Sequence, residues 1–502
     1  MHAHAPTSLH AARRVRELSG LGDGEPIDVL VVGGGITGVG AALDAASRGL
    51  RTVLVERHDL AFGTSRWSSK LAHGGLRYLA SGNVGIARES AVERGILMTR
   101  TAPHLVRALP QLVPLLPSVG RVEKALVRTG FLAGDVLRAT ARTSTSVLPR
   151  SRRIGAAEVV DLAPAVRRDG LRGGLLAFDG QLIDDARLVV ALARTAAGHG
   201  ARILTRVGAY DVTGDSARLR DELTGEEMTV RAGAVVNASG VWAGQVDPSI
   251  TLKPSRGTHL VLDAERLGNP RAALTVPIPG ETNRFVFALP AQLGRVYLGL
   301  TDEAAPGEIP DVPVATEAEI DFLLTTVNTA LGAELTRADV LATYAGLRPL
   351  LDTGDGDTAD LSRNHAVLTS DTGVISVVGG KLTTYRKMAQ DAVDTAVRAG
   401  RLAAGPCVTT NLPLVGTGFG VGTARLPESL RARYGAESAT VAAAGELTPV
   451  ADGIDVTRAE LAFAVSHEGA LDVGDLLDRR TRIGLVAEDR ERALAAAQEA
   501  LA

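Results

Sequence analysis

The sequence predicts a mixed α/β fold: a nucleotide-binding domain on a parallel sheet, interrupted by a mainly antiparallel domain and followed by helices. Buried apolar runs are typical of strands in a parallel sheet covered on both faces, and they occur at 27–32, 52–55, 234–237 and 374–378. Shorter strands of antiparallel type are expected at 259–262, 284–289 and 296–300, with a hairpin turn at 290–294. Alanine-rich sequence after residue 426 predicts helices at 457–468, 473–482 and 489–501.

These patterns divide the 502 residues into four parts. We expect a flexible N-terminal tail at 1–24 and a nucleotide-binding domain at 25–404, whose antiparallel insert covers roughly 80–170 and 245–345. A linker at 405–424 and a C-terminal helical cap domain at 425–502 follow.

The first strand leads into a glycine motif that predicts a Rossmann-like dinucleotide site. Gly33, Gly35 and Gly38 form G-x-G-x-x-G before a helix, and the second strand ends in Glu56. The glycines permit a tight turn, close approach of the backbone to a pyrophosphate, and packing of helix on strand. The helix N-terminus stabilises phosphate charge, and the acid accepts hydrogen bonds from ribose hydroxyls. The alternative is a structural glycine-rich turn with a solvated Glu56.

Composition excludes several classes of function. The formal net charge is −3 without long runs of like charge, which argues against nucleic acid as the main partner. A single cysteine excludes an internal disulfide and a cysteine-rich metal site, so we expect no metal and a reducing compartment. No apolar stretch approaches the roughly 20 residues that a membrane span needs, which leaves attachment to a membrane surface open.

Two further segments combine glycine with polar side chains. One is HDLAFGTSRWSSKLAHGGLRYL at 58–79, and the other is GGKLTTYRKMA at 379–389, between a strand and a helix. A helix N-terminus there would stabilise negative charge on a ring. The chain has only five lysines, so Lys70 and Lys381 within these segments suggest a need for a compact ammonium group.

With these segments, the whole chain resembles the FAD-dependent glycerol-3-phosphate dehydrogenases, within the D-amino-acid-oxidase-like flavoenzymes. The resemblance also rests on VNASG at 236–240, RGTH at 256–259, YAGLRPL at 344–350 and the C-terminal stretch 459–485. It departs from the family pattern at Arg66 and Trp67, where small residues are usual. The resemblance implies oxidation of sn-glycerol 3-phosphate to dihydroxyacetone phosphate by hydride transfer to flavin N5, with electrons passed to a quinone.

The resemblance also implies roles for individual residues. Arg348 and Arg363 would bind the substrate phosphate, Lys381 would lie beside flavin and substrate, and His259 would be the general base. His73 is a competing base or a flavin neighbour, and Lys70 would approach N5 or neutralise a phosphate. The residues expected to bind FAD are Gly33, Gly35, Ile36, Thr37, Gly38, Glu56, Thr64, Ser65, Ser69, Lys70, His73, Gly74, Gly75, Val207, Gly240, Gly380, Lys381, Leu382 and Thr383.

Other functions stay open at this point. An oxidase would return electrons to oxygen, an amine or amino-acid oxidase would bind a carboxylate through one arginine, and a flavin-binding protein would lack turnover. Family members act at the cytoplasmic face of the membrane, so we expect a cytoplasmic protein with peripheral membrane contact, and a homodimer. The basic segment around Arg479, Arg480 and Arg482 would form an interfacial face or pack on the body of the protein.

Overall fold

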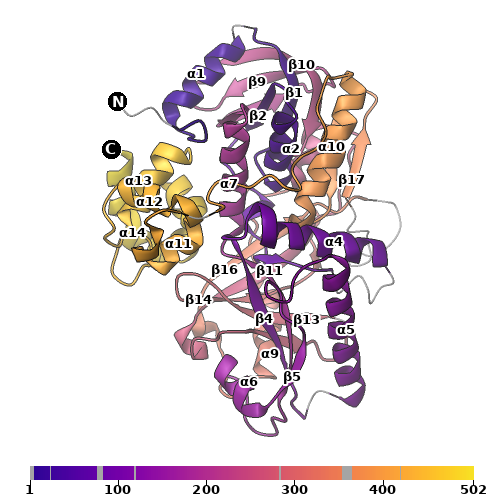
Figure 1. Cartoon of the computed structure of the whole chain (residues 1–502), viewed down its shortest axis with the longest axis vertical. Coiled ribbons are helices and arrows are strands. Elements are labelled where there is room, and N and C mark those ends of the chain that lie inside the picture. Colours follow the sequence, from indigo (N-terminus) through magenta and orange to yellow (C-terminus); the bar gives the residue numbers. More distant parts are fainter. Residues whose placement is uncertain are drawn as a thin grey trace.

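The fold consists of two large sheets and a C-terminal group of helices (Figure 1). The computed structural model describes residues 5–22, 24–75, 83–117, 120–281, 284–352, 365–418 and 420–502, with the backbone alone at 121–124. The predicted fold class is confirmed, because a parallel nucleotide-binding sheet, a mainly antiparallel sheet and a helical C-terminal domain are all present.

The first sheet carries the glycine motif. Its strand order is β17 (His365–Thr369), β18 (Ile375–Gly379), β10 (Glu227–Asn237), β1 (Ile27–Val32), β2 (Thr52–Glu56) and β7 (Arg202–Thr205), with a side branch of β8 (Val207–Tyr210) and β9 (Ser216–Asp221). The strands from β18 to β7 are parallel neighbours, as their apolar runs predict. Helices α2 (Ile36–Ser47), α7 (Asp185–Gly198) and α10 (Tyr385–Gly400) cover one face.

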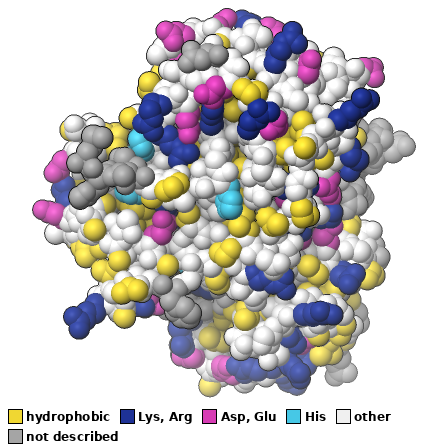
Figure 2. All heavy atoms as spheres, turned by 45° about the horizontal axis from the view of Figure 1, so that its top comes forward, with side chains coloured by type: hydrophobic (Ala, Val, Ile, Leu, Met, Phe, Trp, Pro, Cys, Tyr) yellow, Lys and Arg dark blue, Asp and Glu magenta, His cyan; other side chains and the backbone are white. Residues whose placement is uncertain are grey.

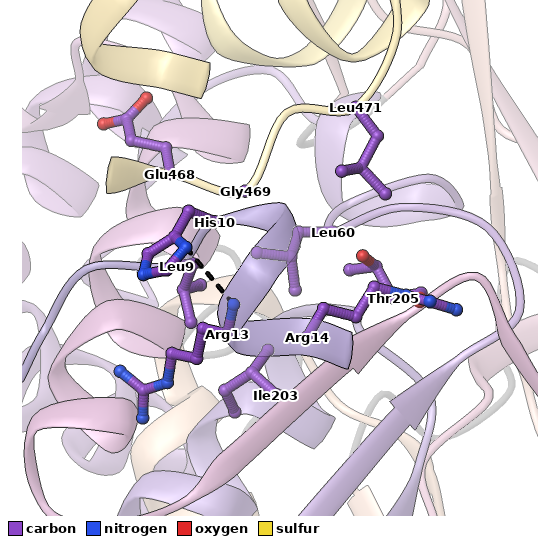
Figure 3. Close-up of a pocket in the computed structure, with 10 residues that line it drawn as sticks. All are labelled: Leu9, His10, Arg13, Arg14, Leu60, Ile203, Thr205, Glu468, Gly469 and Leu471. Carbon is purple, nitrogen blue, oxygen red and sulfur yellow. Dashed lines mark hydrogen bonds between the residues drawn. The ribbon is translucent and has the colours of Figure 1, made fainter. Parts of the chain in front are cut away.

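The predicted N-terminal tail is wrong, because residues 11–22 form helix α1 (Ala11–Gly22) on the other face of this sheet. Leu18 and Leu21 are buried there, and Arg14 makes a buried ion pair with Asp221. The residues before α1 also bind the C-terminal domain (Figure 3), since Leu9 exchanges two main-chain hydrogen bonds with residues 467 and 469. The N-terminal segment therefore ties the first sheet to the C-terminal helices.

The second sheet is mainly antiparallel. Its order is β15 (Glu303–Ala304), β11 (Ser255–Asp263), β14 (Arg295–Gly299), β13 (Phe285–Pro290), β12 (Ala273–Pro277), β4 (Val106–Pro114), β6 (Gly174–Leu182) and β3 (Leu71–Ala72), with β16 (Val340–Arg348) on β11 and β5 (Arg152–Ile154) on β6. The predicted hairpin is confirmed as β13–β14. The sheet extends past the expected insert boundary at residue 170, because β6 pairs along the whole of β4.

The two faces of this sheet bury different cores. One face packs on α6 (Ala156–Leu162) and α9 (Glu317–Asn328). The opposite face turns toward the first sheet, and α5 (Arg121–Thr140) packs on its β4–β6 end, with α4 (Val84–Ile96) beside α5. Any ligand between the two sheets therefore meets this second face.

The C-terminal domain contains α11 (Glu428–Tyr434), α12 (Ser438–Ala443), α13 (Arg458–His467), a π-helical turn (Asp475–Arg480) and α14 (Ala487–Leu501). Buried ion pairs from Arg479 and Arg480 to Asp59 attach it to the first sheet, and Arg482 is buried as well. Of the two interpretations of this basic segment, packing on the body of the protein is confirmed. In the part of the chain described, no helix is both long and apolar enough to cross a bilayer.

Candidate active site

The two sheets enclose a cavity of about 980 Å³. Its lining includes the loops that follow β1, β2, β10 and β18 at the carboxyl edge of the parallel sheet, together with residues of β11, β13 and β16. Ligands of open α/β sheets bind outside the carboxyl ends of the strands. The volume lies at the upper end of the range for cofactor and small-molecule pockets.

The loop after β1 allows the main chain to approach a ligand closely. Gly33 has a φ of +114°, and a Cβ there would lie 2.6 Å from the carbonyl oxygen of Ala238. Only glycine fits both restraints. Gly35 is the N-cap of α2 and offers no capping side chain. Ser65 Oγ accepts a hydrogen bond from the Ile36 amide at 2.9 Å, and the other amides of the first turn are available to a phosphate.

Glu56 is held beside this glycine loop by main-chain amides. Its Oε2 accepts a hydrogen bond from the Gly34 amide at 2.6 Å, and its Oε1 accepts one from the His58 amide at 2.8 Å. Burial raises the pKa of the carboxyl group, while these two amides act in the opposite direction. Glu56 lines the cavity at the end of β2, where an acid that binds ribose is expected.

Most of the residues predicted to bind the cofactor line this one cavity. They are Gly33, Gly35, Ile36, Thr37, Glu56, Thr64, Ser65, Ser69, His73, Gly75, Val207, Gly240, Gly380, Lys381, Leu382 and Thr383. Residues from six separate segments of the chain thus meet around one space. Their individual contacts with a cofactor stay a prediction.

Two predicted glycines lie outside the lining and serve packing instead. A Cβ on Gly38 would collide with the carbonyl oxygen of Gly33, so this glycine lets α2 lie against β1, as the motif predicts. A Cβ on Gly74 would collide with the guanidinium of Arg94. Arg94 is in turn ion-paired with Asp179, which also accepts a hydrogen bond from the Gly74 amide at 3.1 Å.

The prediction that Lys70 contacts the cofactor is wrong. Its side chain lies beneath the loop, 2% exposed, and Nζ donates to Asp185 Oδ2 at 3.0 Å and to the carbonyl oxygens of Arg66 and Ser68 at 2.9 and 3.0 Å. A buried ammonium needs a carboxylate partner, and Asp185 at the start of α7 supplies it. Lys70 is therefore an internal anchor of the loop.

His259 lies on β11 and lines the cavity with 1% exposure. Its Nε2 shares a hydrogen bond of 2.8 Å with Ser69 Oγ, and its ring stacks on Tyr344 at 4.6 Å. Within the described residues, its buried Nδ1 has no hydrogen-bond partner. Burial, with help from the positive charges of Lys70 and Arg348, keeps the pKa of His259 well below 6.5. The imidazole is therefore neutral and able to accept a proton.

Arg348 ends β16 on the strand next to His259. Its guanidinium donates to Ser255 Oγ at 3.0 Å, Asp302 Oδ1 at 2.9 Å and the carbonyl oxygen of Thr301 at 3.1 Å. The side chain remains 22% exposed and lines the cavity. These bonds hold the guanidinium of Arg348 at the cavity, where its positive charge, partly neutralised by Asp302, can attract an anion.

Lys381 enters the same space from the parallel sheet. It follows β18 and precedes α10, and its Nζ donates to Ser90 Oγ on α4 at 3.0 Å. Next to it, Thr383 Oγ1 accepts a hydrogen bond from the His73 amide at 3.0 Å, which joins the two polar glycine-rich segments. Arg363, the second predicted phosphate ligand, lies outside the described residues.

Sequence reasoning missed Tyr344 and Asp302. Tyr344 lies four residues before Arg348 in one strand, so alternation along YAGLR could have placed both on one face. No sequence signal pointed to Asp302. The unusual Trp67 also lines the cavity, where its ring lies 4.3 Å from the guanidinium of Arg66 and 5.8 Å from Tyr344.

The donor set fits a flavin dinucleotide. The glycine loop leaves a space that a Cβ at Gly33 would fill, and this space with the N-terminus of α2 suits a pyrophosphate. The carboxylate of Glu56, held by main-chain amides, suits a ribose. The second sheet closes the other end of the cavity. The described residues contain no cluster of three or more His, Cys, Asp or Glu side chains able to hold a metal ion.

Comparison with known proteins agrees with this geometry. The family model of FAD-dependent oxidoreductases matches residues 28–386, and that of the C-terminal domain of alpha-glycerophosphate oxidase matches 372–502. The chain is 67% identical to glycerol-3-phosphate dehydrogenase 1 of Mycobacterium tuberculosis, over 98% of each chain. It is 36% identical to glycerol-3-phosphate dehydrogenase of Mycobacterium leprae, over 95% of this chain and 84% of that protein.

A solved structure gives the same result. The glycerol-3-phosphate dehydrogenase of Bacillus halodurans, complexed with FAD, superposes with a TM-score of 0.73 and 27% identity, over 98% of this chain and 94% of that one. The flavoenzyme resemblance is therefore confirmed along nearly the whole length. The chain belongs to the FAD-dependent oxidoreductase family and carries the C-terminal domain of its alpha-glycerophosphate oxidase branch.

Proposed function

We propose that the protein oxidises sn-glycerol 3-phosphate to dihydroxyacetone phosphate with FAD and passes the electrons to a quinone. The observation that carries the proposal is that a neutral, buried His259 and a cationic Arg348 face the cavity lined by the dinucleotide-binding loop. The relative that is 67% identical over 98% of both chains bears the name glycerol-3-phosphate dehydrogenase. The name of this relative and the placement of Arg348 and His259 at the cavity both support a phosphorylated alcohol as the substrate.

The chain's residues divide the work around the bound flavin, which accepts a hydride when substrate is oxidised. The amide end of α2 binds the pyrophosphate, and Glu56 binds the adenosine ribose. Arg348 and Lys381 bind the substrate phosphate and orient the carbinol carbon. His259 accepts the hydroxyl proton, for which the imidazole must be neutral, as its lowered pKa makes it.

The first experiment is anaerobic addition of glycerol 3-phosphate to the FAD-loaded protein. Loss of the visible flavin absorption would support the proposal, and an unchanged spectrum would refute it. Glycerol without phosphate is the matched control, because it keeps the reacting carbon and removes the anion. An oxygen electrode and a quinone-reduction assay then separate a dehydrogenase from an oxidase, the alternative that the name of the C-terminal domain model favours.

We also propose that the protein contacts a membrane surface through α5. Its exposed positions 125, 129, 132, 136 and 139 follow helical spacing and carry no charge, and Leu132 and Val136 are 48% and 63% exposed. In sequence this helix carries four basic and two acidic residues, and one of the basic residues, Arg138, is buried. An uncharged stripe on a basic helix suits the interface of an anionic bilayer.

Sedimentation with vesicles of anionic phospholipid tests this contact. The double variant Leu132→Glu, Val136→Glu should remain in the supernatant, whereas the native protein should sediment with the vesicles. The matched control is Leu223→Glu, because Leu223 is 57% exposed and lies between β9 and β10. Equal sedimentation of the native and double-variant proteins would contradict the assignment to α5.

A further inference from the structure

We propose that the end of the cavity beneath α5, which we call the α5 arm, binds the ring of the quinone acceptor. The α5 arm is lined by Gln111, Val113, Leu126, Val127, Gly130, Phe131, Thr275, Phe285 and Phe287. The inference rests on the proposed function and adds to it the place where the second substrate binds.

The register of the second sheet places the α5 arm on the same face as His259. His259 lies opposite Gly299, Gly299 opposite Phe287, and Phe287 opposite Thr275, in one row across β11, β14, β13 and β12. Neighbouring strands are about 4.8 Å apart, so Thr275 lies about 14 Å from His259 along this row. A three-carbon substrate held at His259 does not reach that far.

Beyond Thr275 the row continues onto β4. Leu274 lies opposite Leu112 in the parallel pairing of β12 with β4, so Val113 is the next neighbour of Thr275 on this face. Val127 and Phe131 of α5 pack against Val113. The helix thus closes the α5 arm over the same face that carries the candidate base.

Besides Thr129 of α5, which is exposed, the α5 arm is lined by apolar side chains and by two unused hydrogen-bonding groups. In the described part of the chain, Gln111 Nε2 and Thr275 Oγ1 are buried and have no hydrogen-bond partner, and Thr275 is 5% exposed. Buried polar atoms without partners are costly and indicate a ligand that supplies the acceptors. A flat apolar ring that carries carbonyl oxygens provides both the contact surface and the acceptors.

A charged ligand suits the α5 arm less well. The charged side chains near it are already engaged, since Arg284 pairs with Glu281 and Asp179 pairs with Arg94. A neutral quinone needs no charged partner. It accepts two electrons and two protons to become the hydroquinone, while the flavin reduced by glycerol 3-phosphate returns to its oxidised form, so the reaction needs no further reductant.

Access to the α5 arm agrees with a ligand dissolved in lipid. Leu126 of α5 lines the cavity and is itself 42% exposed, and the uncharged stripe of the same helix faces outward. The membrane contact proposed above would place that stripe in the bilayer interface. A quinone would then pass from lipid into the α5 arm without crossing a charged surface.

The test uses Gly130→Phe in the FAD-loaded enzyme. Gly130 lines the α5 arm on a helix, and a Cβ there meets no atom within 4 Å, so a large side chain can enter the α5 arm without a backbone clash. The matched control is Gly85→Phe, because Gly85 lies on α4 with the same open surroundings and does not line the cavity. A second variant, Thr275→Val with Gln111→Leu, removes the two unused polar groups at nearly constant volume.

Four measurements separate the possible outcomes. We expect anaerobic flavin reduction by glycerol 3-phosphate and turnover with ferricyanide to stay within about twofold of the native enzyme in every variant. We expect the KM for a short-chain quinone to rise roughly tenfold or more in Gly130→Phe and in the double variant, and to be unchanged in Gly85→Phe. Equilibrium dialysis of a tailless naphthoquinone should show the same order of binding without turnover.

Several results would overturn the inference. Native quinone KM and native dialysis binding in Gly130→Phe would place the acceptor elsewhere. A native enzyme that reduces oxygen and no quinone would remove the ligand that the inference names, while glycerol 3-phosphate oxidation would stand. Failure of the proposed function itself is different, because then glycerol 3-phosphate would not bleach the flavin of the native enzyme.

Discussion

Removal of the Asp185 charge is the sharpest test of the buried pair beneath the site. Asp185 is fully buried, and its Oδ2 accepts from Lys70 Nζ at 3.0 Å, the Ser68 amide at 2.9 Å and Ser68 Oγ at 2.7 Å. Asp185→Asn keeps the shape of the side chain and removes the carboxylate that is hydrogen-bonded to the ammonium of Lys70. The loop that carries Ser69, the partner of His259, is then destabilised.

The magnitude follows from the surroundings of Lys70. Breaking a buried ion pair by removing one partner costs about 3–5 kcal/mol. Two carbonyl oxygens still accept from Nζ, and the Tyr344 ring lies 4.8 Å from it, so the lower end applies. We therefore expect the free energy of unfolding to fall by about 3 kcal/mol. Adding Lys70→Met to Asp185→Asn should restore most of that loss, because neither member of the pair is then charged.

Urea unfolding followed by tryptophan fluorescence measures this loss. Both tryptophans of the chain, Trp67 and Trp242, line the cavity and report on the site directly. Asp161→Asn is the control, since Asp161 pairs with Arg271 on the surface and its loss should cost less than about 1 kcal/mol. A loss below about 1 kcal/mol in Asp185→Asn, or no recovery in the double variant, would refute the assignment of Lys70 as a loop anchor.

Three further predictions concern the cofactor, the base and the anion site. Gly33→Ala should yield protein without visible flavin absorption, because its Cβ would lie 2.6 Å from the Ala238 carbonyl at a φ of +114°. The fall of kcat/KM at acid pH should lie below pH 6.5, because burial lowers the pKa of His259 and protonation of this base stops the reaction. The residual activity of His259→Ala should not show this fall. Arg348→Lys should raise the KM for glycerol 3-phosphate roughly tenfold with little change in ferricyanide KM, because an ammonium cannot keep the bond to Asp302 and also bind a phosphate through a fork.

The central strands and the glycine loop were predictable because their signals are local. The apolar runs at 29–32 and 53–55 identify buried parallel strands, and the glycines identify the turn between strand and helix. The positions of Gly33 and Glu56 follow from that unit alone. The pairing of His259 with Tyr344 across β11 and β16 does not, because strand register between distant segments leaves little trace in a single sequence.

Two of the predictions that the structure overturns share a physical cause. Lys70 stands among glycines and hydroxyls that line the cavity, and only its left-handed backbone, with a φ of +58°, and the distant Asp185 turn its side chain inward. Helix α1 has few apolar residues, and the partners that bury Leu18 and Leu21 come from the sheet. In both cases the deciding contact is a tertiary one, which local composition does not encode.

The arrangement of one sheet face would allow the two proposed half-reactions to share a single cavity. His259 and Arg348, on adjacent strands, are placed to bind and deprotonate the alcohol, whereas the α5 arm begins three strands away on the same face. Each strand step adds about 4.8 Å, so a side chain can be changed at one end without contacting a ligand at the other. Substrate specificity and acceptor choice should therefore vary independently, with the acceptor set by the residues of α5 and β12 and the alcohol set by β11 and β16.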